Sequence, residues 1–205
     1  MPRVKVARKS TAIDMTAMCD VAFLLLTFFI LTAKPKTDDP SKAEVPPSTI
    51  MLPVKDANMI TISVGANRAF FSVTELDVRE GALKAMGEKY GVSFTPEEAH
   101  RFTLTPIFGV PMKNLKSFLD TDPSEVKNFP QTGIPADTTN NSELFNWIYT
   151  SRQAERALHD KLLDVSIKAD RKEEYPMINI IISVLEKQKL FKFQLITSLK
   201  TESKK

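Results

Sequence analysis

The sequence predicts an α+β fold, in which a single N-terminal transmembrane helix precedes a small domain of a mixed β-sheet packed on helices, with an irregular insertion. Three observations lead to this prediction. One long apolar run lies near the N-terminus, alternating β-type patterns occur in two separate regions, and helical apolar stripes lie between and after them. With 205 residues, 42% of them hydrophobic and 26% charged, the chain has room for about one folded domain with appendages.

The composition argues against several classes of function. The formal net charge is only +3, and acidic and basic residues are mixed along most of the chain, so we expect no nucleic-acid partner. His100 and His159 are far apart, and the single cysteine adds no ligand at a metal-binding spacing. The chain has no glycine-rich phosphate loop, nucleophile elbow or His-Glu-x-x-His motif. We therefore predict a protein that is not an enzyme and has no catalytic residues, no metal site and no cofactor.

The N-terminal region has the features of a membrane anchor. Residues 1–11 are predicted to be a cytoplasmic tail, because their basic residues are not balanced by any acid. Residues 12–33 are predicted to form a transmembrane helix, since 22 residues at about 1.5 Å each span a hydrocarbon core of ~30 Å. The sequence Lys34-Pro35-Lys36 ends the apolar run. We expect a single-pass protein of a cell membrane, with everything after Lys34 on the far side, which is the periplasm in a Gram-negative cell.

A cleaved signal peptide is the main alternative for this region. A basic start, an apolar core over residues 21–33 and a cleavage site after Ala33 fit that interpretation. Asp14 and Asp20 argue against it, because a secretory signal gains nothing from two acids ahead of its apolar core.

Asp20 is the candidate functional residue of the predicted helix. A charged Asp at the centre of a spanning helix costs about 2.5–3.5 kcal/mol on insertion scales, so its presence needs an explanation. Thr16 and Thr27 lie four residues before and seven residues after it, which places the three polar side chains on one stripe. Such a stripe faces protein or water and not lipid, so we expect Asp20 to have a function, with Thr16 and Thr27 as its supporting polar residues.

The transmembrane sequence AIDMTAMCDVAFLLLTFFILTA resembles the signature of the ExbD/TolR family. In that family the pattern Ile-Asn-Val-Thr-Pro-x-x-Asp-Val precedes an aliphatic and aromatic run. Four positions match, and two depart, with Asp14 in place of Asn and Ala17 in place of Pro. The matching residues are Ile13, Thr16, Asp20 and Val21.

Residues 34–57 are predicted to be a periplasmic linker, and residues 58–200 a folded periplasmic domain. The linker is rich in Pro, Ser, Lys and Asp, a composition that extends the chain without folding it. The sequence STIMLPV near its end is apolar enough to pair as a strand or to bind in a groove.

The first half of the domain is predicted to be a hairpin followed by a helix. Residues 59–64 and 69–73 are alternating strands joined by the sequence GANR. A helix should follow, with Thr74 as its cap and Gly91 as its end. Its buried stripe is predicted to contain Leu76, Leu83 and Met86. Beyond it, residues from about 92 to 141 are interpreted as an irregular insertion with short helices at PEEAHRFTL and PMKNLKSFL.

The second half of the domain is predicted to contain two helices and two strands. A helix should begin after a Ser142 cap, followed by a strand at VSIKA, a helix that Pro176 opens, and a closing strand at KFQLITSL. The buried residues of these helices are predicted to be Leu144, Trp147, Ile148, Ala154, Ala157 and Leu158 in the first, and Ile178, Ile181, Ile182 and Leu185 in the second.

This half also resembles the ExbD/TolR periplasmic domain. Ala169, Asp170 and Tyr175 match the Ala-Asp and Tyr positions of the family, and the resemblance covers residues 10–73 and 142–199. It implies an inner-membrane subunit of a motor driven by the proton-motive force, which energises TonB-dependent transport across the outer membrane. In such a motor, Asp20 would be the proton carrier, supported by Thr16 and Thr27. The implied partners are an ExbB-like multi-helix membrane subunit, a TonB-like transducer, a second copy of the chain in a homodimer, and the lipid bilayer.

Two other functions stay open at this point. One is a motor of the same type with a different output, such as a TolR-like envelope-maintenance protein or a gliding or stator subunit. The other is a membrane-anchored or secreted binding domain without motor activity. Asp20 separates the motors from the anchor, because only a motor needs a carboxyl group that titrates.

Overall fold

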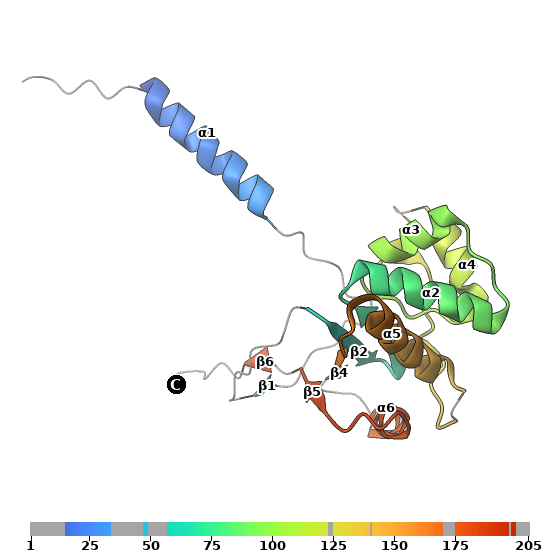
Figure 1. The fold of residues 1–205 in the computed structure, drawn as a ribbon. Helices are drawn as coiled ribbons and strands as arrows, with labels where there is room; N and C mark the ends of the chain where they lie inside the picture. The colour runs from blue at the N-terminus through green and yellow to red at the C-terminus, as the bar shows by residue number, and fades with distance from the viewer. Residues whose placement is uncertain are drawn as a thin grey trace, which may run out of the picture. The chain divides into compact units, whose positions relative to one another are not determined.

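The computed structural model describes residues 15–33, 47–48, 57–122, 125–139, 141–169, 175–196 and 198–199 (Figure 1). The chain divides into two compact units, Met1–Thr37 and Asp38–Lys205. The predicted tail, most of the predicted linker, Asp14 and Asp170 lie outside the described residues.

The fold is α+β, as predicted. In the first unit, helix α1 spans Met15–Thr32. The second unit contains five more α-helices, a short 3-10 helix and six strands in the described ranges. They are β1 (Pro47–Ser48), β2 (Met59–Gly65), β3 (Arg68–Val73), α2 (Leu76–Tyr90), α3 (Pro96–Leu104), α4 (Met112–Asp120), η1 (Val126–Asn128), α5 (Glu143–His159), β4 (Asp164–Ala169), α6 (Tyr175–Lys187), β5 (Phe193–Leu195) and β6 (Ser198–Leu199).

The predicted hairpin is confirmed as the pair β2 and β3. Its strands pair antiparallel from Ile60 opposite Val73 to Gly65 opposite Arg68. Ala66 and Asn67 form the connection, with φ angles of 53° and 57°. Two successive residues with positive φ are typical of the type I′ turn, whose twist matches that of the strands.

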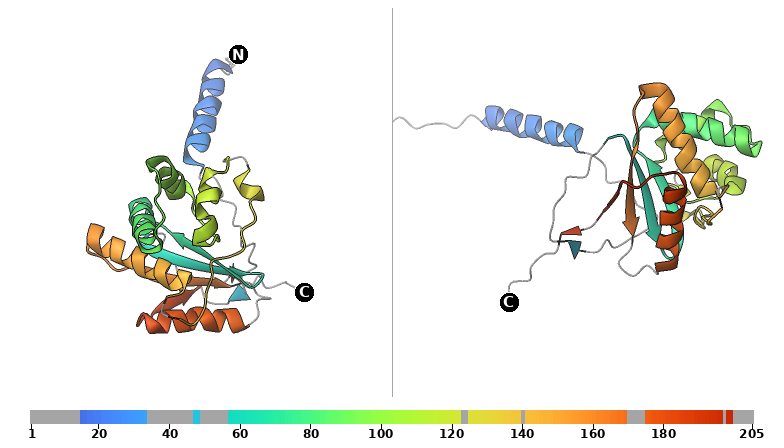
Figure 2. Two further views of the ribbon diagram at one scale, coloured as in Figure 1. Left: turned by 90° about the vertical axis from the view of Figure 1, so that its right-hand side faces the viewer. Right: turned by 60° about the horizontal axis from the view of Figure 1, so that its bottom comes forward.

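The main sheet is mixed and has the strand order β3-β2-β4-β5. Strand β4 pairs parallel with β2 and with β5, while β1 and β6 form a separate parallel pair. The long helices α2, α5 and α6 lie on one side of the main sheet (Figure 2). The core forms where apolar strand residues meet these helices. It includes Ile60, Ile62, Val165 and Ile167 from the strands and Leu83, Met86, Trp147, Ile148, Ile181 and Leu185 from the helices.

The predicted C-terminal end of helix α2 is confirmed, but its predicted N-cap is wrong. Gly91 ends it in the left-handed region, with a φ of 68°. The N-cap is Glu75 rather than Thr74, and the Thr74 hydroxyl donates to the carbonyl of Met59. Leu76, predicted to be buried, is 55% exposed, because the helix begins with it and the buried stripe starts only at Val78.

Helix α5 begins as predicted, since the Ser142 hydroxyl accepts a hydrogen bond from the Phe145 amide. Trp147 is 1% exposed and lies in the core, as predicted. The predictions for Ala157 and Leu158 are wrong, because both are exposed. The buried stripe of α5 ends at Glu155, one turn before the end of the helix.

The C-terminal elements follow the prediction with one difference. Strand β4 contains VSIKA, and helix α6 begins at Tyr175 with Pro176 as its second residue. The predicted strand KFQLITSL is divided, because β5 pairs with β4 while β6 pairs with β1.

The segment predicted as an insertion contains the two short helices expected, α3 and α4, but it is also part of the core. Its buried side chains include Phe102, Phe108, Val110, Leu115, Phe118 and Ile134. Sequence reasoning missed this role, because these residues follow no strand or helix period over a long stretch.

The same segment covers the outer edge of β3. Phe71 and Phe108 exchange two backbone hydrogen bonds, with N···O distances of 2.8 and 3.1 Å. The Ile134 amide donates to the Ala69 carbonyl, and the Gly133 amide donates to Gly109. An uncovered edge strand is a template for pairing with other chains, so this segment protects one side of the sheet.

We expect Gly109→Ala to weaken the packing of this segment against the edge of β3. A Cβ atom at position 109 would lie 2.3 Å from a ring carbon of Phe70, which is itself only 3% exposed. Overpacking of this kind costs about 1–3 kcal/mol of the free energy of unfolding. Thermal denaturation followed by circular dichroism measures the loss, and an unchanged melting temperature would show that the Phe70 ring can move away without cost.

Candidate functional site

Within the described residues, α1 is the one helix long and apolar enough to cross a membrane. Its 18 residues extend about 27 Å at 1.5 Å per residue. All its side chains are exposed except that of Thr27, which is half-buried. Its apolar side chains therefore need a cover that the described chain does not supply, whether lipid or another protein.

Asp20 lies in the first half of α1, five residues after Met15, or about 7.5 Å along the axis. It is the one charged residue between Met15 and Thr32. In the described part of the chain, its carboxylate has no hydrogen bond or ion pair. The Asp20 side chain is thus accessible to a partner protein or to water.

The helical geometry brings the three predicted site residues onto one face. At 100° per residue, Thr16 lies about 40° and Thr27 about 20° from the direction of Asp20. The Thr27 hydroxyl donates to the Leu24 carbonyl at 2.9 Å, a bond within the helix. Thr27 therefore has its donor occupied, and an acceptor lone pair remains for a bond from outside.

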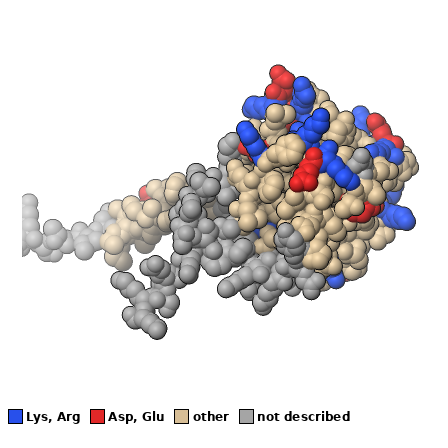
Figure 3. Space-filling model, turned by 90° about the horizontal axis from the view of Figure 1, so that it is seen from below, with Lys and Arg blue, Asp and Glu red and all other residues tan. Residues whose placement is uncertain are grey.

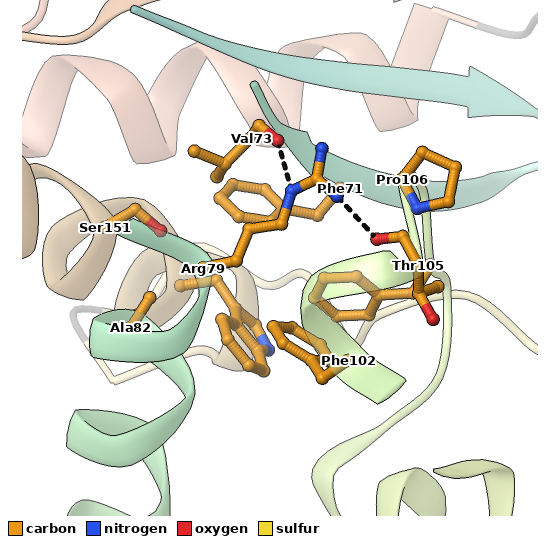
Figure 4. Close-up of a pocket in the computed structure, with 10 residues that line it drawn as sticks. Phe71, Val73, Arg79, Ala82, Phe102, Thr105, Pro106 and Ser151 are labelled. Carbon is orange, nitrogen blue, oxygen red and sulfur yellow. Dashed lines mark hydrogen bonds between the residues drawn. The ribbon is translucent and has the colours of Figure 1, made fainter. Parts of the chain in front are cut away.

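The folded unit contains a small aromatic cavity between the sheet and the helices (Figure 4). Its volume is about 10 Å³, the size of one water molecule, so it is too small for a metabolite. Its walls are formed by Phe71, Val73, Arg79, Ala82, Phe102, Thr105, Pro106, Phe108, Trp147 and Ser151.

Arg79 lies at this cavity and joins three parts of the fold. Its guanidinium donates to the carbonyls of Val73 at 2.5 Å, Thr103 at 2.7 Å and Thr105 at 3.3 Å. Figure 4 shows it between the end of β3 and the segment after α3. Burial lowers the pKa of Arg79, although the nearby Glu75 carboxylate acts in the opposite direction. The role of Arg79 is structural, because these three carbonyls and that of Thr74, at 3.4 Å, take up its donors.

The surface charge gives no other strong candidate on the face shown in Figure 3. Lys and Arg side chains there alternate with Asp and Glu. That face has no continuous basic surface of the kind that follows a phosphate backbone. Among the described residues, no group of three His, Cys, Asp or Glu side chains is placed to hold a metal ion.

Comparison with known families identifies the family of the chain. The family model described as biopolymer transport protein ExbD/TolR matches residues 7–200, which includes α1 and almost all of the second unit. The chain belongs to the ExbD/TolR family. No curated protein and no solved structure matches the chain.

Family membership settles the general role of the chain. ExbD/TolR proteins are membrane-anchored, and they are non-enzymatic accessory subunits of transport. This chain is therefore a subunit that helps to energise biopolymer transport, and it acts in a complex with other membrane proteins. Asp20, Thr16 and Thr27 lie within the matched residues.

Proposed function

We propose that the chain is the ExbD-type subunit of an ExbB–ExbD motor, which uses the proton-motive force to energise TonB-dependent transport across the outer membrane. The observation that supports this most directly is the position of Asp20, the one charged residue of the apolar helix α1 (Met15–Thr32) in an ExbD/TolR protein. We propose the inner membrane as its location, with the N-terminus in the cytoplasm. The proposed division is a tail at 1–11, a transmembrane helix at 12–33, a linker at 34–57 and a periplasmic domain at 58–200, with the insertion at about 92–141.

Asp20 is the proposed proton carrier. A protonated carboxyl group tolerates an apolar wall, whereas the ionised form needs water, a hydrogen-bond donor or a positive charge. Each uptake and release of a proton therefore changes which surroundings Asp20 prefers. Thr16 and Thr27 lie on the same face and support Asp20 by binding water or the carboxyl group.

The membrane potential supplies enough energy for such a step. Moving one charge across the membrane is worth about 2.3 kcal/mol for each 100 mV. This energy produces motion only if the two sides of the helix offer different surroundings to Asp20. One spanning helix cannot form a channel around itself, so a multi-helix ExbB-like partner must supply these surroundings.

The folded unit is proposed to transmit the work of the motor. It forms a homodimer and passes work to a TonB-like transducer in the periplasm. The linker, with its four prolines between Thr37 and Pro53, transmits or limits the motion.

A gene deletion distinguishes the proposed output from its alternatives. We expect cells without this chain to lose energy-dependent uptake of iron complexes or vitamins and to keep detergent resistance and surface movement. Loss of detergent resistance would instead indicate a TolR-like protein, and loss of movement a gliding subunit. No change in any of the three would contradict a motor and favour a static anchor.

A further inference from the structure

Three titratable side chains connect the first turn of α2 with the last turn of α5. Asp77 lies in the first turn of α2, and Glu155 and His159 lie one turn apart on α5. The Nε2 atom of His159 is 3.0 Å from an Asp77 carboxylate oxygen, and its Nδ1 atom is 2.9 Å from a Glu155 carboxylate oxygen. One imidazole ring thus bridges two carboxylates from two helices.

The three side chains differ strongly in their contact with solvent. The side chain of Glu155 is 0% exposed, while those of His159 and Asp77 are 35% and 53% exposed. Within the described part of the chain, the Oε1 atom of Glu155 is buried without a hydrogen-bond partner. A buried carboxylate is costly unless it is paired, so Glu155 depends on His159.

The protonation state of His159 decides how many carboxylates it can bind. A protonated imidazole has two N–H donors and a positive charge, so it can donate to Glu155 and Asp77 together. A neutral imidazole has one N–H donor, and the carboxylate that faces its other nitrogen meets a lone pair. Loss of one proton therefore breaks one of the two bonds and leaves two negative charges near each other.

We propose that Asp77, His159 and Glu155 form a pH-sensitive clip between α2 and α5, closed when His159 is protonated and released when it is neutral. The clip concerns only the folded unit and does not depend on the proposed motor. It gives the helix layer a means of responding to the pH of the compartment in which this unit lies.

The other charged groups near the clip act in both directions. Lys161, in the segment after α5, opposes protonation of His159 by charge repulsion. On α5 itself, Arg152 lies three residues before Glu155, and its Nε atom is buried without a partner in the described residues. Burial lowers the pKa of Arg152, but the guanidinium remains a cation.

The sign of the effect follows from the surroundings of His159. The hydrogen bond with Glu155 raises the pKa of His159 above its ordinary value of 6.5, desolvation opposes this rise, and the Asp77 charge adds to it. The folded state therefore binds the proton more tightly than the unfolded state does. The stabilisation is complete below the unfolded pKa of about 6.5 and is lost as the pH rises through the raised folded value.

Release of the clip should loosen the helix ends and leave the middle of the interface in place. One turn after Asp77, Gly81 packs against Ala154, where even a Cβ atom on Gly81 would lie only 3.1 Å from the Ala154 Cβ atom. We expect the change to be confined to the first turn of α2 and the last turn of α5.

Nuclear magnetic resonance of the two histidine rings tests the clip in the full-length chain in detergent micelles. The chain has two histidines, and the signals of His159 are assigned by their loss in His159→Gln. We expect His159 to titrate above the ordinary histidine value of 6.5. Glu155→Gln should lower the midpoint of His159 towards that ordinary value.

Thermal denaturation of the same chain provides the second measurement. His159→Gln should lower the melting temperature at about pH 5 and have little effect at about pH 9, where the wild-type clip is already open. Asp77→Asn, at an exposed position, should reduce the same pH dependence and serves as the second variant if Glu155→Gln does not fold. A His159 midpoint that Glu155→Gln leaves unchanged, or a loss of melting temperature that is the same at both pH values, would overturn the proposal.

Discussion

Asp20→Asn should abolish energy-dependent transport while leaving the chain inserted in the membrane and bound to its partners. The amide has nearly the same shape as the carboxyl group and can form hydrogen bonds, but it does not titrate near neutral pH. Uptake of iron complexes or vitamins, measured in cells whose only copy carries the substitution, should fall to the level of cells that lack the chain.

The adjacent residue provides the matched control. Cys19 precedes Asp20 but points about 100° away around the helix, so it lies off the stripe formed by Thr16, Asp20 and Thr27. Cys19→Ala should retain full uptake. Both variants should be found in the membrane fraction and should co-purify with the multi-helix partner in wild-type amounts.

The outcome separates the motor from the static anchor. An anchor needs only the apolar length of α1, and an uncharged Asn costs less to insert than an ionised Asp. Normal uptake by Asp20→Asn would therefore exclude a proton-carrying role and leave the anchor as the better interpretation. Normal uptake by Cys19→Ala together with no uptake by Asp20→Asn would assign the effect to the titrating group itself.

The parts of the fold that the sequence predicted are those set by local rules. The hairpin follows from alternating residues around a short turn. Gly91 ends its helix because glycine readily adopts a positive φ. Ser142 begins its helix because its hydroxyl accepts a hydrogen bond from a backbone amide of the first turn. The position of Asp20 on a helical stripe also follows from spacing alone. These features need no knowledge of what lies across the fold.

The parts that the sequence did not predict depend on contacts between distant residues. Phe102 and Phe108 lie in a stretch of weak periodicity, and only the folded structure shows that they pack against Trp147 from α5. Asp77 and His159 are in different halves of the domain, so their ion pair has no local signature. The same limit applies to Asp20, whose proposed surroundings in the membrane belong to partner subunits.

Trp147→Ala should be the most destabilising substitution in the folded unit. The indole ring contacts three phenylalanine rings at centroid distances of 4.9 Å for Phe108, 5.6 Å for Phe102 and 6.1 Å for Phe71. Removing a buried Trp costs about 3–5 kcal/mol, a large part of the 5–15 kcal/mol that stabilises a typical domain. Circular dichroism should follow the denaturation, because Trp147 is the only tryptophan and its fluorescence disappears with the substitution.

Tyr149 is the control for this substitution, because it lies two residues away on α5 and is 46% exposed. Tyr149→Ala removes a stacked contact with Phe145 and should cost only about 0.5–1 kcal/mol. A loss of stability from Trp147→Ala as small as this would mean that the segment containing Phe102 and Phe108 does not share the core.

If the full loss of stability is observed, the cell should degrade much of the Trp147→Ala variant, and uptake should fall with the amount of protein. Asp20→Asn should instead lose uptake at normal abundance, so the amount of protein in the membrane distinguishes loss of folding from loss of the proposed proton carrier.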